Sequence, residues 1–144
     1  MPTIEEAFYA YIRQQEPIVA MIGDRLYPNM APQSATFPYA TYARASVDTH
    51  YMNLGPTGTF TTAFLLECWS LEKSPKQAKQ LATRFRAALD GYAGDWDGLE
   101  IDGVFLLDEV DKVEYAHDGS DAMIQVVALM FDCWHARDTM LFLP

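Results

Sequence analysis

The alternation of hydrophobic and polar residues is clearest between residues 37 and 71. Two runs there, Tyr39–Val47 and Thr59–Leu71, are rich in Tyr, Phe, Thr and Val, which suit a pleated, half-buried strand. The segment between them ends in Gly55-Pro56-Thr57-Gly58, where proline presets φ and glycine accepts positive φ. The pattern therefore predicts a β-hairpin over about 39–71 with a long tip, and no catalytic motif falls on it.

Helical spacing appears first near the N-terminus. Ile4, Phe8 and Ile12 recur on one face, and Thr3 with Glu6 forms a capping-box pattern, so we expect a helix over 3–15. A second short helix is expected over 17–22, because Pro17 suits the first helical position and Gly23 suits the end. A short strand is expected at 25–27.

A third helix is predicted over 75–90. Ser74 is a candidate N-cap, Pro75 suits the first helical position, and Gly91 suits the C-terminal end. Its apolar stripe consists of Ala78, Leu81, Phe85 and Ala88, with Leu89 beside it. Its basic residues are expected to point away from that stripe: Lys76, Lys79, Arg84 and Arg86.

Two further strands are predicted at 103–115 and 121–135. The second is apolar on both faces, one carrying Met123, Val127, Leu129, Phe131 and Cys133, the other Ile124, Val126, Ala128 and Met130. Such a strand must be covered on both sides. The helix over 75–90, with the N-terminal helix near it, supplies one cover. The sequence contains no third layer, so we expect a neighbouring subunit on the other face.

These elements predict a single α+β domain spanning residues 1–144. Its core is an antiparallel sheet of mainly four long strands with helices packed on one face. The hairpin at about 39–71 forms an arm, and residues from about 136 to 144 form a C-terminal tail.

The charge distribution changes this picture more than the composition does. The net charge is −10, the opposite of the balance that proteins use to bind DNA phosphates. Residues 90–121 hold eleven carboxylates and a single base, Lys112. These acids are Asp90, Asp95, Asp97, Glu100, Asp102, Asp108, Glu109, Asp111, Glu114, Asp118 and Asp121.

Targeting features are absent from the sequence as given. No apolar run approaches the ~20 residues that span a bilayer, and the first residues carry acids where a signal peptide needs a basic start. We therefore expect a protein made in a cytoplasm, with no membrane contact. No motif calls for a cofactor, so none is expected. The two cysteines do not form a disulfide framework.

One metal site is conceivable. Glu67-Cys68-Trp69-Ser70 and Asp132-Cys133-Trp134-His135 both end predicted strands, which suggests that the two ends share one edge of the sheet. Cys68, Cys133 and His135 could then bind zinc. The alternative is that both cysteines are small buried apolar residues, and a disulfide between them is disfavoured in a reducing compartment.

Other chemistry has weaker support. No nucleophile elbow, P-loop, dinucleotide fingerprint or H-E-x-x-H occurs. A calcium loop starting at Asp95 fails, because its fifth residue is Leu99 rather than an oxygen ligand. Adjacent Asp108 and Glu109 should face opposite sides of a strand, so they do not form an acid–base pair. The basic helix face could touch nucleic acid, but it is better explained as solvated or as meeting an acidic neighbour.

Several short motifs occur in a characteristic order: Gly23-Asp24-Arg25-Leu26-Tyr27-Pro28, Ala31-Pro32, Phe37-Pro38-Tyr39, Gly55-Pro56-Thr57-Gly58, Ala87-Ala88-Leu89-Asp90-Gly91 and Phe131-Asp132-Cys133-Trp134-His135. Their order and spacing resemble the tail completion proteins of long-tailed bacteriophages, also called tail terminator or tail-to-head joining proteins. The likeness covers about residues 4–135, and prophages and gene transfer agents carry similar proteins. The chain departs from the pattern in its apolar tail, 139–144, and in the acidity of 104–115.

This resemblance implies a non-enzymatic α+β subunit that forms a ring, a homohexamer, on the head-proximal end of the tail tube. There it would end tube growth and join the tail to the neck or connector protein within the virion. DNA would pass through the ring without specific binding. The family has no catalytic residues to transfer to this chain.

Two sets of residues are candidates for these roles. Carboxylates lining a channel would repel DNA over about a Debye length, ~8 Å at physiological salt; the candidates are Asp95, Asp97, Glu100, Asp102, Asp108, Glu109, Asp111 and Glu114. The hairpin tip is the candidate arm for reaching a neighbour; it comprises His50, Tyr51, Met52, Asn53, Leu54, Gly55, Pro56, Thr57 and Gly58. A small metal-binding or enzymatic domain using Cys68, Cys133 and His135, and a nucleic-acid or regulatory binding module, are the competing functions.

Overall fold

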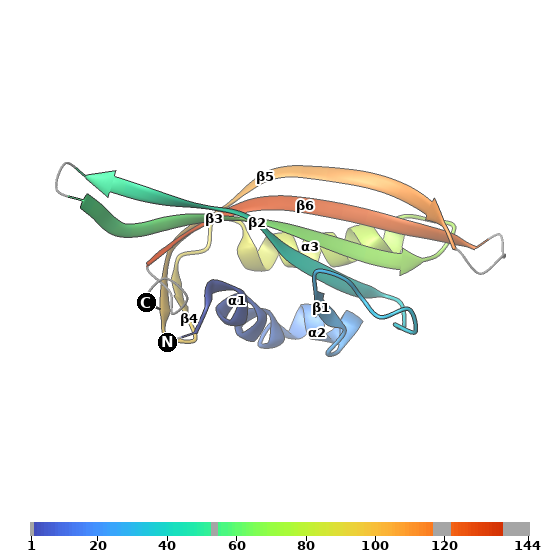
Figure 1. Cartoon of the computed structure of the whole chain (residues 1–144). Coiled ribbons are helices and arrows are strands. Elements are labelled where there is room, and N and C mark those ends of the chain that lie inside the picture. The colour runs from blue at the N-terminus through green and yellow to red at the C-terminus, as the bar shows by residue number, and fades with distance from the viewer. Residues whose placement is uncertain (1, 53–54, 117–121, 137–144) are drawn as a thin grey trace.

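A computed structural model of the chain describes residues 2–52, 55–116 and 122–136, with the backbone alone between 49 and 58. Its centre is a curved six-stranded sheet in the order β1-β2-β3-β6-β5-β4 (Figure 1). The strands are β1 (Leu26–Pro28), β2 (Tyr39–Met52), β3 (Gly55–Leu71), β4 (Gly94–Trp96), β5 (Leu99–Tyr115) and β6 (Met123–Ala136).

The α+β class and the four long strands agree with the sequence-based prediction, but the sheet is larger and mixed. β1 pairs with β2 in parallel, and the other neighbouring strands are antiparallel. β4 was missed because a three-residue strand is too short to show an alternating pattern. The strand predicted from Gly103 begins four residues earlier, at Leu99.

In the described part of the chain, three helices lie on one face of the sheet, and the opposite face carries no helix (Figure 1). They are α1 (Ile4–Arg13), α2 (Glu16–Ile22) and α3 (Lys76–Leu89). The predicted capping box forms: the Glu6 N–H donates to Thr3 Oγ1 at 3.1 Å and the Thr3 N–H to Glu6 Oε1 at 3.4 Å. α2 ends at Gly23 with φ of 58°, a conformation that glycine adopts readily.

The start of α3 differs from the prediction by one residue. Pro75, rather than Ser74, occupies the N-cap position, and the Lys76 N–H donates to Ser74 Oγ at 3.2 Å. The hydroxyl therefore caps from one residue further out, since proline has no side-chain acceptor. At the other end Gly91 has φ of 77°, as expected of a residue just past a helix.

The core lies between the helices and the sheet. Phe8 of α1 contacts Phe64 of β3 and Phe131 of β6, with ring centroids 5.2 and 5.8 Å apart. All three side chains are at most 1% exposed. Buried aromatic side chains of this kind contribute roughly 1.5–3 kcal/mol each, so this cluster joins the helix layer to the two central strands.

The hairpin of β2 and β3 is longer than predicted, and its turn lies elsewhere. Strand pairing continues to Met52 opposite Gly55, so the predicted turn at 55–58 belongs to β3. The register is irregular between Thr49 and Tyr51, and Pro56 pairs next to that irregularity, one of the places where a strand tolerates proline. The turn predicted from Pro56-Thr57-Gly58 is therefore not made, because these residues belong to β3.

A second hairpin joins β4 to β5 in the Asp-rich segment that was considered as a calcium-binding loop. Trp96 pairs with Leu99, and the two residues between them, Asp97 and Gly98, have φ of 52° and 92°. Two positive φ values match the type I′ turn that Asp-Gly favours. The Gly98 N–H also donates to Asp95 Oδ1 at 2.7 Å. The Asp-rich segment weighed as a calcium loop is therefore a turn.

No helix in the described part of the chain is long and apolar enough to cross a membrane.

Candidate assembly surfaces

The face of the sheet that lies away from the helices is called here the open face. Cross-strand register assigns its central rows: Ala43, Leu65, Met130 and Asp108 lie in one row, and Trp69, Val126 and Lys112 lie in another. The face assignment predicted for β6 is confirmed: Leu129, Phe131 and Cys133 face the core, and Ala128 and Met130 face the open side. No described element covers this face.

A polar and aromatic belt crosses one end of the open face. Tyr39 stacks on Trp69 with centroids 5.8 Å apart, and the Trp69 indole N–H donates to Thr41 Oγ1 at 3.2 Å. Lys112 Nζ lies 5.9 Å from the centre of the Trp69 ring and 2.9 Å from Glu67 Oε2. These contacts partly cover Val126, which is 1% exposed although it lies on the open face.

The second half of β5 is the most exposed apolar part of the described chain. The described chain has eight exposed large hydrophobic side chains, and five of them lie on β5. These five are 50 to 65% exposed: Phe105, Leu107, Val110, Val113 and Tyr115. Every residue from Leu107 to Val113 is exposed, on both faces of the strand. Exposed apolar side chains concentrated on one strand indicate a contact surface.

The eight acidic candidates do not form one surface. Asp95, Asp97, Glu100 and Asp102 lie in the β4–β5 hairpin and are exposed, whereas Asp108 and Glu114 lie on the open face of β5.

Glu109 and Asp111 face the helices. Asp111 lies 3.0 Å from Lys79 Nζ, and Glu109 lies 3.8 Å from Arg86. The basic side of α3 was predicted to be solvated or to meet an acidic neighbour; it meets acids, and they belong to the same chain. Arg84 instead donates to the Pro17 carbonyl at 2.6 Å.

The three residues weighed as zinc ligands do not converge. Cys133 lies opposite Thr62, which is six residues before Cys68 in β3, so the two sulfurs are separated by roughly 20 Å at about 3.3 Å per residue. The expectation that the two Cys-Trp strand ends share a sheet edge is wrong, because β3 and β6 are antiparallel. Among the described residues, no three His, Cys, Asp or Glu side chains could hold a metal ion.

Both cysteines are buried free thiols. Burial, and then nearby Glu109 and Glu67, raises the pKa of Cys68 far above its usual value. Burial, and then Asp102 and Asp132, does the same to the pKa of Cys133. Neutral thiols of this kind are inert packing residues.

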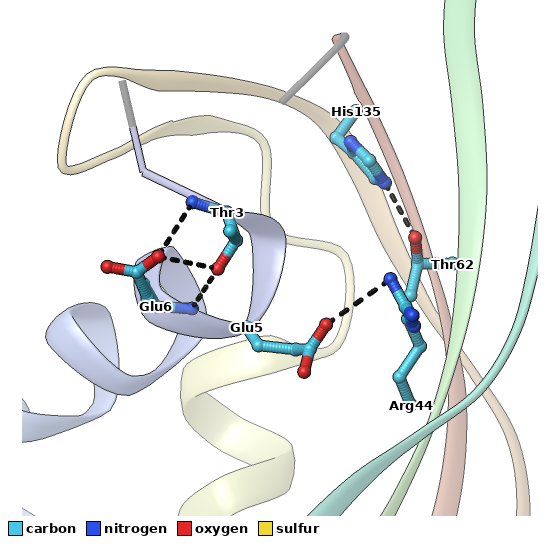
Figure 2. Close-up of polar contacts among 6 residues, drawn as sticks. All are labelled: Thr3, Glu5, Glu6, Arg44, Thr62 and His135. Atoms are coloured by element: carbon cyan, nitrogen blue, oxygen red, sulfur yellow. Dashed lines mark hydrogen bonds and ion pairs between the residues drawn. The ribbon is translucent and has the colours of Figure 1, made fainter. Parts of the chain in front are cut away.

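His135 forms a buried polar contact that sequence analysis did not find. The Thr62 hydroxyl lies 2.7 Å from His135 Nε2 (Figure 2). His135 Nδ1 lies 2.6 Å from the Ala136 carbonyl. Because a carbonyl can only accept, Nδ1 carries the proton and Nε2 accepts from the hydroxyl. Both residues are 0% exposed, so the contact joins β3 to β6 inside the fold.

A groove of about 440 Å³ lies beside this contact, where the start of α1 meets β2 (Figure 2). Arg44 of β2 forms an ion pair with Glu5 of α1 at 3.3 Å on its rim. Both side chains are about 40% exposed, so the pair is screened by solvent and contributes at most about 1 kcal/mol. The groove gathers no activated nucleophile, and we assign it no chemistry.

The hairpin tip is described only in part. The backbone of 50–52 and 55–58 belongs to β2 and β3, which project past the helices (Figure 1). Asn53 and Leu54 lie outside the described residues, as does the tail from 137 onward.

Comparisons with known proteins identify the family and the fold. The family model described as "Tail completion protein gp17" matches residues 6–130. A chain from the structure titled "Virion of native gene transfer agent (GTA) particle" superposes with a TM-score of 0.73 at 17% identity, covering 93% of this chain and 95% of its own. A second solved chain, at 14% identity and a TM-score of 0.48 over 90% of this chain and 92% of its own, is too distant to inform the fold.

A search of curated protein sequences finds no match. The likeness to the gene transfer agent chain concerns the fold. The family model carries the identification because it spans most of the chain, including most of α1, all of α2 and α3, and the long strands as far as residue 130 in β6. The chain therefore belongs to the tail completion protein gp17 family and is a structural tail protein of the bacteriophage virion.

Proposed function

We propose that this protein forms a homohexameric ring on the head-proximal end of the phage tail tube. The ring ends tube growth, joins the tail to the neck or connector protein, and leaves a channel for DNA. The subunits are made and assembled in the bacterial cytoplasm. The carrying observation is the family match over residues 6–130; the shape of the chain supplies the physical support.

That support comes from the layering of the fold. Helices cover one face of the sheet, and the exposed apolar side chains gather on β5 rather than being scattered. A lone subunit of this kind leaves apolar surface in water, which a neighbouring subunit would remove. The projecting β2–β3 hairpin adds an arm that can reach past its own helices toward an adjacent ring.

The channel is proposed to carry acidic side chains. Six of the eight candidates, those of the β4–β5 hairpin together with Asp108 and Glu114, form no ion pair with Lys or Arg in the described part of the chain. Unneutralised carboxylates repel DNA phosphates at short range and keep the duplex from sticking to the wall. We place part of this set on the channel wall.

Electron microscopy of tails produced without this protein tests the proposal. Tails of uncontrolled length that carry no heads are expected, because nothing would stop tube growth or supply the neck contact. Complementation with the wild-type gene should restore uniform tails joined to heads. Tails of normal length that join heads normally would exclude both roles.

A further inference from the structure

Two strands of the sheet have long outer edges without a strand partner in the described residues. β1 covers β2 at 40–42, so the outer edge of β2 is open from Ala43 to Met52. At the opposite edge of the sheet, β4 covers β5 at 99–101. Residues 90–92 form hydrogen bonds with Val104 and Leu106 of β5. The outer edge of β5 is therefore open from Leu107 to Tyr115. Open edges are ready templates for pairing with another chain.

The two open edges match one another. They are ten and nine residues long, or roughly 30 Å at about 3.3 Å per residue. Three successive antiparallel pairings separate β2 from β5, so the two strands run in opposite directions. A second copy that continues the sheet would therefore place its β2 antiparallel to β5 of the first copy, with every helix on the same side.

From these edges we propose that β5 of one copy pairs with β2 of the next, so that the ring is a continuous inter-subunit β-sheet. The inference rests on the ring proposed above and specifies its interface. Such a contact is heterologous: each copy offers a different edge to each neighbour, and repetition of the same contact closes a ring.

Charge explains why β5 does not pair with a second β5. The open part of β5 carries Asp108, Glu109, Asp111 and Glu114 against Lys112. Glu109 and Asp111 are paired with bases of α3, and Lys112 is paired with Glu67. Two such edges side by side would therefore bring together the unpaired carboxylates of Asp108 and Glu114, and like charges are destabilising across a strand pair. The open part of β2 carries Arg44 and Asp48 and is balanced apart from His50. The charged residues on β5 thus disfavour the symmetric dimer and leave the β2 edge as the compatible partner.

The position of the open edges sets the geometry of the ring. Ala43 and Asp108 lie in the same row across the sheet. From that row, the open part of β2 runs toward the 53–54 loop and the open part of β5 runs the opposite way. Full overlap therefore requires a neighbour displaced along the strands by up to about 30 Å. The strands must then be inclined to the ring axis, as they are in closed barrels.

Backbone alternation identifies the amides that the contact uses. On β5 the N–H groups of Val104, Leu106 and Glu109 bond to groups outside the β6 ladder, so alternation directs the Val113 N–H outward. On β2 the Ala40 N–H points outward and donates to the Arg25 carbonyl. The N–H groups of β2 alternate between β3 and the outer edge, and the register shifts by one residue at Ala45. With this shift included, the Val47 N–H also points outward. Proline at either position removes an outward donor and spares the ladders inside the chain.

The test uses Val113→Pro and Val47→Pro, with Val113→Thr and Val47→Thr as controls that keep the N–H. Masses are measured by light scattering on each protein alone and with tail tubes added, after circular dichroism has shown which variants fold. We expect rings from the wild type and the threonine variants, and monomers from each proline variant. An equimolar mixture of the two proline variants should form a species of about twice the monomer mass, because one intact edge pair remains.

The outcomes separate the two proposals. Wild-type chain that stays monomeric with and without tubes would remove the ring and this interface together. Wild-type rings alongside folded proline variants that still form rings, or a mixture that yields no dimer, would overturn the edge pairing and leave the ring standing. If the proline variants do not fold, amide hydrogen exchange of the wild type decides: slow exchange at Val47 and Val113 in the ring supports the pairing, and fast exchange there refutes it.

Discussion

At the scale of single residues, this protein depends on a few buried aromatic rings. Phe8 is 0% exposed and contacts four other rings, those of Tyr42, Phe64, Trp96 and Phe131. It is therefore the residue through which α1 is attached to the sheet. The exposed rings behave differently, because Phe105 of β5 is half in solvent and has little to lose within its own chain.

Replacing Phe8 with alanine should lower the free energy of unfolding by about 3–5 kcal/mol, through lost burial and the cavity left behind. Urea titration followed by circular dichroism measures this change under conditions where the wild type is monomeric. Phe105→Ala is the matched control and should change stability by about 0.5 kcal/mol or less. A small effect at Phe8 would contradict its central place in the core.

Tyr42 links residue chemistry to pH. Burial, followed by Tyr9 and Glu5, raises the pKa of Tyr42 to about 12 from its usual 10.0. The folded state therefore holds this proton more tightly than the unfolded state does. The resulting stabilisation is fully present below pH 10.0 and is lost as the pH rises toward about 12.

We expect the melting temperature of the wild type to fall more steeply between pH 10 and 12 than that of Tyr42→Phe, which lacks the ionising hydroxyl. Thermal melts of both proteins across this range measure the difference. Parallel curves would show that Tyr42 ionises alike in the folded and unfolded states.

At the scale of elements, the two hairpins show how turn chemistry and strand pairing compete. The β4–β5 turn obeys its local sequence, since both Asp97 and Gly98 have the positive φ that a type I′ turn needs. The β2–β3 hairpin does not, because cross-strand pairing continues beyond Pro56-Thr57-Gly58 to Met52 opposite Gly55. A short hairpin relies on its turn, whereas a long one can override a local preference.

Gly98→Val should accordingly destabilise the protein by about 1–2 kcal/mol, the cost of a left-handed conformation in a residue with a branched side chain. A Cβ added at Gly98 would meet no atom within 4 Å beyond its chain neighbours, so the penalty is one of backbone conformation rather than of space. Asp97→Asn is the control, since Asn tolerates positive φ. Equal stability of Gly98→Val and wild type, by urea titration, would contradict the turn assignment.

At the scale of the whole molecule, charge is divided between surfaces with different roles. Glu109 and Asp111 meet the basic side of α3, whereas the carboxylates of the β4–β5 hairpin have no such partners among the described residues. A uniform acidic strand in the sequence thus becomes an internally paired surface and a free one. Under the proposed function, the free surface is the one available to line a channel.

Neutralising the free surface tests this division. A triple variant that neutralises this surface should slow DNA ejection from assembled particles: Asp97→Asn, Glu100→Gln and Asp102→Asn. The reason is that the channel wall then repels the DNA phosphates less, so the duplex can adhere to it. Glu16→Gln with Asp24→Asn, two exposed acids outside the candidate set and outside both open edges, is the control and should leave ejection unchanged. Ejection is followed by the fluorescence of released DNA, and assembly by particle counts. Normal ejection from the triple variant would remove these three residues from the channel wall.

Local chemistry alone was enough to predict much of the fold. The capping box at Thr3, the stripe on α3 and the two faces of β6 follow from short-range periodicity, and the structure confirms them. The order of the motifs also identified the family. Each of these depends on residues close in the chain or on a pattern repeated along it, which a sequence displays directly.

Tertiary structure decided which residues meet. The separation of Cys68 from Cys133 follows from the antiparallel pairing of β3 with β6, and the partition of the acids follows from the side of β5 that faces α3. The two open edges exist because β1 and β4 are far shorter than the strands they border. Strand order and register come from long-range packing, and no local pattern encodes them. The candidate residues could therefore be read from the sequence, while the surfaces they form required the fold.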